Sequence, residues 1–282
     1  MKAILFIICL GSGWCAGFAQ NVNVLVTDIR EERQLDQKSS SLELRIKVNG
    51  ITVDENRKIK IGRVIKATDN LGNELKQVVG SFDNDYTENN EVKLKLGAPA
   101  RNATHLDVVE ATLKYFTPTK ANKGLVEVVK PLDRYNTNLL KGLSTDVGLI
   151  LIDEAGLKKL KEENEAAYNK EMEKFKKENP AEAAKMGDLV GGLKSFFESM
   201  FSYGSYGPVM TFLVDDPKDK IVAINVYDEQ GTKVNNGWSK SDKQLSVMLS
   251  SEPKNTWKLE VLLENPQSVK EHTFKLGQVF LP

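Results

Sequence analysis

Short runs in which apolar and polar residues alternate constrain this chain more than any other feature. Between residues 42 and 48, the sequence LELRIKV places an aliphatic side chain at every second position and a charged one between each pair. A period of two puts the aliphatic side chains on one face of a β-strand and the charged ones on the other. Runs of the same kind predict further strands at 22–27, 58–68, 74–82, 91–96, 106–116 and 125–129.

The rhythm of these strands indicates a fold class. Turn-forming sequences separate them, such as DNLGN at 69–73 and DNDYTENN at 83–90. About seven short strands in roughly 110 residues are typical of an immunoglobulin-like β-sandwich. A second set of strands is predicted at 147–152, 209–214, 220–227, 244–250, 257–263 and 272–280.

The two sets share a sequence pattern. VIKATDNLGNEL (64–75) matches AINVYDEQGTKV (223–234), with Asp69 on Asp228 and Gly72 on Gly231. In each, we expect the Asp to bond the turn backbone and the Gly to supply a positive φ. Residues 92–113 also resemble residues 245–263. We therefore predict an internal repeat: a mainly β protein of two tandem immunoglobulin-like β-sandwiches, at 20–135 and 136–282.

A helical segment interrupts the second set of strands. Asp153 can cap a helix from 154 to about 179, Pro180 ends it, and Asp188 can cap a second helix that reaches Phe201. We expect a helical hairpin, inserted at about 153–204 in the second sandwich. The second helix has one continuous apolar face. That face can pack on its own sandwich, on a partner or sister subunit, or on a membrane surface.

The first residues are typical of an export signal. Lys2 precedes an apolar run at 3–10, and small residues occupy Gly17 and Ala19, which predicts a signal peptide at 1–19. Its removal takes away both cysteines, Cys9 and Cys15, and leaves no thiol. A lipid on Cys15 or a membrane anchor are the alternatives. No later segment has 18 continuous apolar residues, so we expect a periplasmic or extracellular protein without a transmembrane segment.

Composition and motifs argue against several functions. The 39 basic residues balance the 39 acidic ones, which leaves no positive excess for nucleic acid. The two histidines, His105 and His272, are far apart in sequence, and we find no nucleophile elbow or phosphate-binding loop. We expect no enzyme, no cofactor and no metal site. Two acidic loops leave calcium open as an alternative to ordinary turns: Asp83, Asp85 and Glu88 in one, and Asp215, Asp216 and Asp219 in the other.

Apolar and aromatic side chains are the candidates for partner binding. Trp238 follows an NNG turn sequence, and two tyrosines lie in the glycine-rich segment SYGSYGP at 202–208. Such aromatics can bind sugars by stacking or can anchor a protein partner. Trp257 begins an alternating strand and is assigned to the core. The predicted interaction residues are Leu193, Phe196, Phe197, Met200, Phe201, Tyr203, Tyr206 and Trp238.

The whole pattern has a family resemblance. The signal, the repeated turn segments and the final strand FKLGQVFLP (274–282) resemble secreted bacterial proteins of the Bacteroidetes type that are built from tandem immunoglobulin-like modules. The resemblance implies no reaction. We expect a non-catalytic binding or scaffolding protein of the periplasm or cell surface, whose partner is a protein or a second copy. The alternative is a carbohydrate-binding accessory module of the cell envelope.

Processing of the signal is directly testable. Cleavage after Ala19 is the position that puts small residues at both recognition sites of the signal, so the mature chain should begin at Gln20. The intact mass of protein purified from the envelope should match residues 20–282. A mass that includes a lipid on Cys15 would contradict both the cleavage site and the absence of an anchor.

Overall fold

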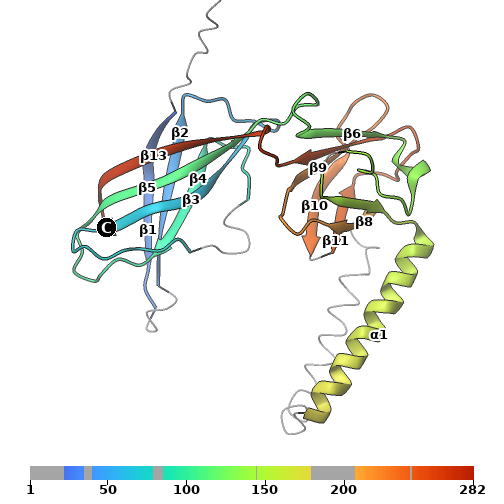
Figure 1. The fold of residues 1–282 in the computed structure, drawn as a ribbon, viewed down its shortest axis with the longest axis horizontal. Coiled ribbons are helices and arrows are strands. Elements are labelled where there is room, and N and C mark those ends of the chain that lie inside the picture. The colour runs from blue at the N-terminus through green and yellow to red at the C-terminus, as the bar shows by residue number, and fades with distance from the viewer. Residues whose placement is uncertain (1–21, 35–39, 79–84, 144, 179–206, 242) are drawn as a thin grey trace, which may run out of the picture. The chain divides into compact units, whose positions relative to one another are not determined.

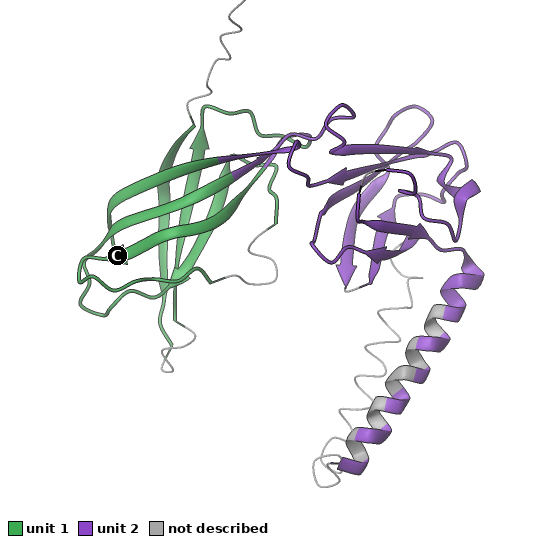
Figure 2. Cartoon of the chain, in the orientation of Figure 1, with its two compact units in different colours: residues 1–55, 59–113, 272–282 green, residues 56–58, 114–271 purple. Residues whose placement is uncertain are grey.

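A computed structural model describes residues 22–34, 40–78, 85–143, 145–178, 207–241 and 243–282. The protein is mainly β, with several antiparallel sheets (Figure 1). It divides into two compact units (Figure 2). Unit 1 contains residues 1–55, 59–113 and 272–282, and unit 2 contains residues 56–58 and 114–271.

Unit 1 consists of two three-stranded sheets. The first has the order β1-β2-β4, with β1 (Asn23–Glu32), β2 (Ser41–Asn49) and β4 (Glu91–Gly97) pairing antiparallel. The second has the order β13-β5-β3, from β13 (Val269–Phe280), β5 (His105–Phe116) and β3 (Lys58–Asp69). The alternation at 42–48 is confirmed, because the aliphatic residues of β2 are buried. Its charged residues lie on the more exposed face.

Unit 2 has a four-stranded and a three-stranded sheet around one apolar core. The order of the first is β10-β11-β8-β7, from β10 (Asn235–Ser241), β11 (Gln244–Leu249), β8 (Val209–Asp215) and β7 (Gly148–Leu151). The order of the second is β6-β12-β9, from β6 (Leu125–Val129), β12 (Lys258–Leu263) and β9 (Ile221–Tyr227). Both sheets contribute to the core cluster, which includes Phe212, Leu259 and Trp257. The assignment of Trp257 to the core is confirmed.

The units divide the chain differently from the expected boundary at 135. β6 pairs with β12 and so belongs to unit 2, whereas residues 272–280 of β13 lie beside β5 in unit 1. The Thr117 N–H donates to the Ser268 carbonyl over 2.8 Å, and the Leu281 N–H donates to the Thr104 carbonyl over 3.0 Å. β13 and β5 therefore run antiparallel. Alternation fixes which face of a strand is buried but does not specify its neighbour in the sheet.

The two matched turns have the expected geometry. Oδ1 of Asp69 accepts from the backbone N–H groups of residues 71 and 73, and Oδ1 of Asp228 accepts from those of residues 230 and 232. Gly72 has φ +84° and Gly231 has φ +80°. Each Asp also donates its N–H to the carbonyl four residues later. The roles predicted for the aspartates and glycines are confirmed.

Two strand predictions differ from the structure. The described part of 74–82 forms only isolated bridges, from Glu74 to Thr68 and from Gln77 to Leu96. Conversely, β10 was not predicted, because its sequence NNGWSKS has no apolar alternation. It is an outer strand of the sheet that pairs with β11 alone, so pairing rather than burial defines it.

One helix follows β7 in the chain. α1 (Glu154–Glu178) begins where the sequence predicts, and Asp153 caps it: Oδ1 accepts from the Gly156 N–H over 2.7 Å. The Asn136 amide donates to the other Asp153 oxygen over 2.9 Å. The expected second helix at 188–201 lies outside the described residues.

A disulfide trap tests the assignment of β6 to unit 2. Val129 and Lys258 are register partners, so cysteines at both positions should bridge in a chain with Cys9 and Cys15 replaced by serine. The control pair is Val129→Cys with Tyr227→Cys. Tyr227 lies one strand further across the sheet, at about 9–10 Å, which is too far for a disulfide. Mass spectrometry after mild oxidation should find only the first bridge; its absence would contradict the pairing of β6 with β12.

Candidate functional site

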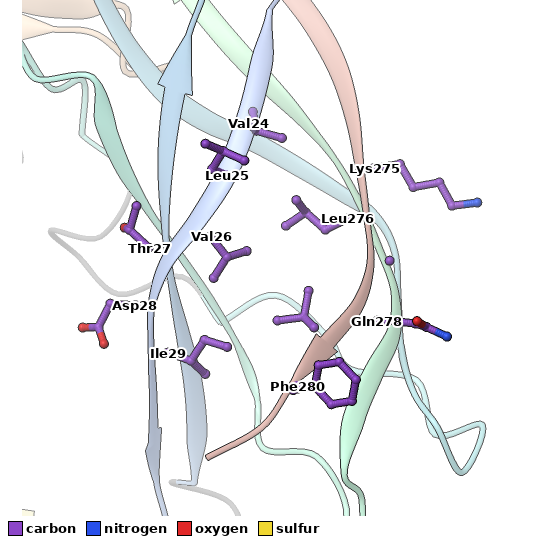
Figure 3. Close-up of a pocket in the computed structure, with 12 residues that line it drawn as sticks. Val24, Leu25, Val26, Thr27, Asp28, Ile29, Lys275, Leu276, Gln278 and Phe280 are labelled. Atoms are coloured by element: carbon purple, nitrogen blue, oxygen red, sulfur yellow. The ribbon is translucent and has the colours of Figure 1, made fainter.

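An open groove runs along one side of unit 1, between β1 and β13 (Figure 3). Its volume is about 620 Å³, and residues 24–29 and 275–280 line it. Each wall is the outermost strand of its own sheet. Volumes of this size are in the range of ordinary ligand sites.

The side chains that face the groove are apolar. Val24, Val26 and Ile29 from β1 point into the space, and Leu276 from β13 points toward them (Figure 3). Phe280 also lines the groove; 70% of its surface is exposed, and the centre of its ring lies 5.7 Å from that of His105 on β5. An aromatic side chain exposed to this extent beside an apolar groove is a candidate binding contact.

Each groove strand contains a backbone irregularity, near the middle of β1 and close to the end of β13. The register of β1 with β2 shifts between Val26 and Asp28, and Gln278 in β13 has φ +49°. One extra residue in a strand restores the inward direction of the following side chains, so Ile29 and Val279 again face inward. Bulges of this kind also discourage uncontrolled edge-to-edge pairing.

The charged residues near the groove are directed away from it. Asp28 points to the outer face of β1, where its carboxylate pairs with Arg30 at 2.9 Å and with Arg45 at 3.6 Å (Figure 3). Lys275 points outward from β13. The Thr27 hydroxyl bonds the Arg45 carbonyl and Glu91, so it is also turned away. The side chains that point into the groove are therefore uncharged.

The interaction residues predicted from sequence lie elsewhere. Seven of them, at 193–203 and 206, fall in 179–206, outside the described residues. Trp238 lies in β10 and not in the expected loop, and it is partly buried against the core of unit 2. A tryptophan packed in this way offers less of its ring for stacking on a sugar.

In the acidic loop at 215–219, the Asp216 carboxylate is bound by donors from within unit 2. The Asp216 side chain is 1% exposed and accepts from Lys240 Nζ at 2.8 Å and from the backbone N–H groups of residues 220 and 221. Burial alone would raise the pKa of Asp216, but these hydrogen bonds outweigh it and hold the pKa below 3.8. Burial would lower the pKa of Lys240, yet its bonds to Asp216 and Asp219 raise it above 10.5.

These contacts bear on the calcium alternative. The Lys240 ammonium group already pairs with both Asp216 and Asp219, so their oxygens serve this cation. Asp83 of the other acidic loop lies outside the described residues. Within the described ranges, no three His, Cys, Asp or Glu side chains are grouped so that they could hold a metal ion.

Comparison with known proteins gives no relative. No family model matches the chain, no curated protein matches its sequence, and no solved structure matches its fold. Among the described residues, no helix combines the length and the apolar character needed to cross a membrane.

Sequence reasoning missed the groove because of how it is formed. The alternation predicts a strand at 22–27, but it does not predict the bulge that turns Ile29 inward. The final strand was predicted at 272–280, in the second module. Only the pairing of β13 with β5 brings it opposite β1.

The Asp216–Lys240 pair predicts an acid dependence of stability. Because the pKa of Asp216 is lowered on folding, its carboxylate stabilises the fold above pH 3.8 and loses this effect as the pH falls through the folded-state pKa. Asp216→Asn should lower the free energy of unfolding at pH 7 by about 2–3 kcal/mol, with a smaller difference at pH 3. Urea unfolding of the parent chain and the variant at pH 7 and at pH 3 measures the two differences in the free energy of unfolding.

The matched control uses the other carboxylate on Lys240. Asp219 is 81% exposed, so Asp219→Asn should cost less than about 1 kcal/mol. Equal losses from both variants would contradict a special role for the buried carboxylate. A rise of several degrees in the melting temperature on adding millimolar calcium would contradict the assignment of this loop to lysine.

Proposed function

We propose that this protein is a non-catalytic binding or scaffolding protein of the periplasm or cell surface, and that it binds a protein partner as an extended segment in the groove of unit 1. The observation that carries the proposal is the pair of outer strand edges, with the apolar side chains of Val26, Ile29 and Leu276 between the two strands. The outer edges of β1 and β13 present backbone N–H and C=O groups with no neighbouring strand in the described sheets.

An extended polypeptide matches these features. It offers alternating N–H and C=O groups to a strand edge, and its side chains project to one face at every second residue. Because the groove-facing side chains are uncharged, the matching residues of the partner should be uncharged as well. A sugar supplies hydroxyl groups and no apolar side chains at strand spacing. With Trp238 packed against the core, a protein partner is favoured over the carbohydrate alternative.

The remaining sequence expectations are consistent with this function. We propose that each unit is an immunoglobulin-like β-sandwich, on the basis of the strand rhythm and the similar strand orders of the units. We also propose that α1 belongs to a helical insert between β7 and β8, and that residues 1–19 direct export. Sandwich modules at the cell surface commonly serve recognition rather than chemistry, which accords with the absence of enzyme motifs in the sequence.

Peptide binding tests the groove. The probe is a capped, fluorescent peptide, Lys-Val-Thr-Val-Thr-Val-Thr-Lys, with apolar residues at every second position. Phe280→Ser should weaken its binding about 10-fold, because a buried aromatic contact is worth roughly 1.5–3 kcal/mol. Val129→Ser removes an apolar side chain that is 62% exposed in unit 2, and it should leave the affinity within about twofold. Fluorescence anisotropy gives both affinities.

A second probe separates strand addition from simple apolar contact. N-methylation of every second amide of the peptide keeps the side chains but removes donors along one edge, so binding should fall more than about 10-fold. Equal binding of the two peptides would show that side chains alone are recognised. If the parent chain binds neither peptide, the groove does not take extended segments.

A further inference from the structure

The two units contain corresponding strands in the same order. β4, β2 and β1 are neighbours in unit 1 in the way that β11, β8 and β7 are neighbours in unit 2. β3 lies beside β5, as β9 lies beside β12. The turns after β3 and β9 share the Asp contacts and the glycine with positive φ described above. This agreement in order and in local geometry indicates that one module was duplicated.

The last strand of each module breaks this correspondence. β6 follows β5 in the chain but pairs with β12, and β13 follows β12 but lies beside β5. In an unexchanged arrangement, each would fold back on the strand that precedes it as a hairpin. Each last strand therefore completes a sheet of the other module.

Strand lengths favour the exchanged pairing. β13 and β5 each have 12 residues, whereas β6 has 5 and β12 has 6. In the unexchanged arrangement, the short β6 would leave about half of the β5 edge without a partner, and β13 would extend far beyond β12. Unpaired backbone groups at a sheet edge are costly when they are shielded from water. In the exchanged pairing, β13 and β5 have equal lengths, so neither strand is left with a long unpaired edge on the side where they meet.

The loops that permit the exchange are held together within unit 2. The Leu263 N–H donates to the Gly124 carbonyl over 2.7 Å, and the Asn265 amide donates to the Asn122 carbonyl over 3.1 Å. Ser268 is fully buried there. A Cβ on Gly124 would lie 2.6 Å from the Ser268 Cβ, so the approach of the loops requires glycine.

We propose that the two modules have exchanged their last strands, and that this exchange makes the groove of unit 1 dependent on the folding of unit 2. The second part rests on the function proposed for the groove. β13 begins in unit 2 at 269–271 and supplies the groove wall at 275–280. With unit 2 folded, the start of β13 is fixed beside the end of β5. With unit 2 unfolded, the same docking must close a loop of residues 114–271, which is entropically expensive.

Hydrogen exchange of the full chain tests this dependence. Val247 is fully buried in β11, in unit 2, so Val247→Ala lowers the stability of that unit. Exchange should accelerate at the amides of 272–280 and 105–113 by the same factor as in β11, about 10-fold. Val129→Ala is the matched control, because this valine is exposed in unit 2, and it should leave exchange within about twofold. Acceleration confined to unit 2 would overturn the proposal.

A disulfide bond that ties β13 to β5 provides a second test. Thr104→Cys with Leu281→Cys, in a chain with Cys9 and Cys15 replaced by serine, ties the strands where the Leu281 N–H donates to Thr104. In the oxidised chain, Val247→Ala should still accelerate exchange in unit 2 but change unit 1 by less than about twofold. If amide exchange in unit 1 still accelerates in the presence of the disulfide, β13 does not link the two units, and the proposal is overturned.

Peptide binding is measured separately on the same proteins. Loss of coupled exchange with intact peptide binding contradicts this inference alone. Coupled exchange without peptide binding contradicts the proposed function of the groove, and it leaves the strand exchange supported.

Discussion

The pairing of β13 with β5 is the interaction on which the groove of unit 1 depends. It adds the third strand of one sheet and holds Leu276 and Val279 opposite the residues of β1. Backbone hydrogen bonds near both ends, at Thr117 and at Leu281, keep the two strands in register. Without unit 2, the same pairing would close a loop of residues 114–271, at an entropic cost of about 5 kcal/mol. This is comparable to the whole stability of many domains.

In this chain, the turn geometry is specified locally, whereas the pairing of the last strands is specified by residues far apart in sequence. The turns at 69–73 and 228–232 are specified by a few adjacent residues, and each uses one carboxylate to bind two N–H groups. Asp69 makes a further bond to the Ala100 N–H at 3.1 Å, which ties the turn to the loop before β5. Such turns form in either copy of a repeat, whichever strand completes the sheet. We attribute the pairing of the last strand to strand length and to the contacts between the crossing loops.

The predictability of the structure follows the same division. Alternation correctly gave β2, most of β5 and the burial of Trp257, and the cap at Asp153 was evident from its position before a helical sequence. β10 was missed because pairing alone defines it, and Trp238 was consequently misplaced in a loop. The groove could not be predicted because its walls are distant in sequence, and the bulges that orient Ile29 and Val279 leave no pattern in composition or period.

The walls of the groove are the first and the last strands described along the chain. During synthesis, β1 is made early and β13 only after all of unit 2 has been added. A chain that stops, or is clipped, before residue 275 has one wall and exposes the edge of β5 instead. Such a fragment presents a long strand edge of the kind that leads to aggregation. The groove is therefore complete only in molecules that have been translated through residue 280.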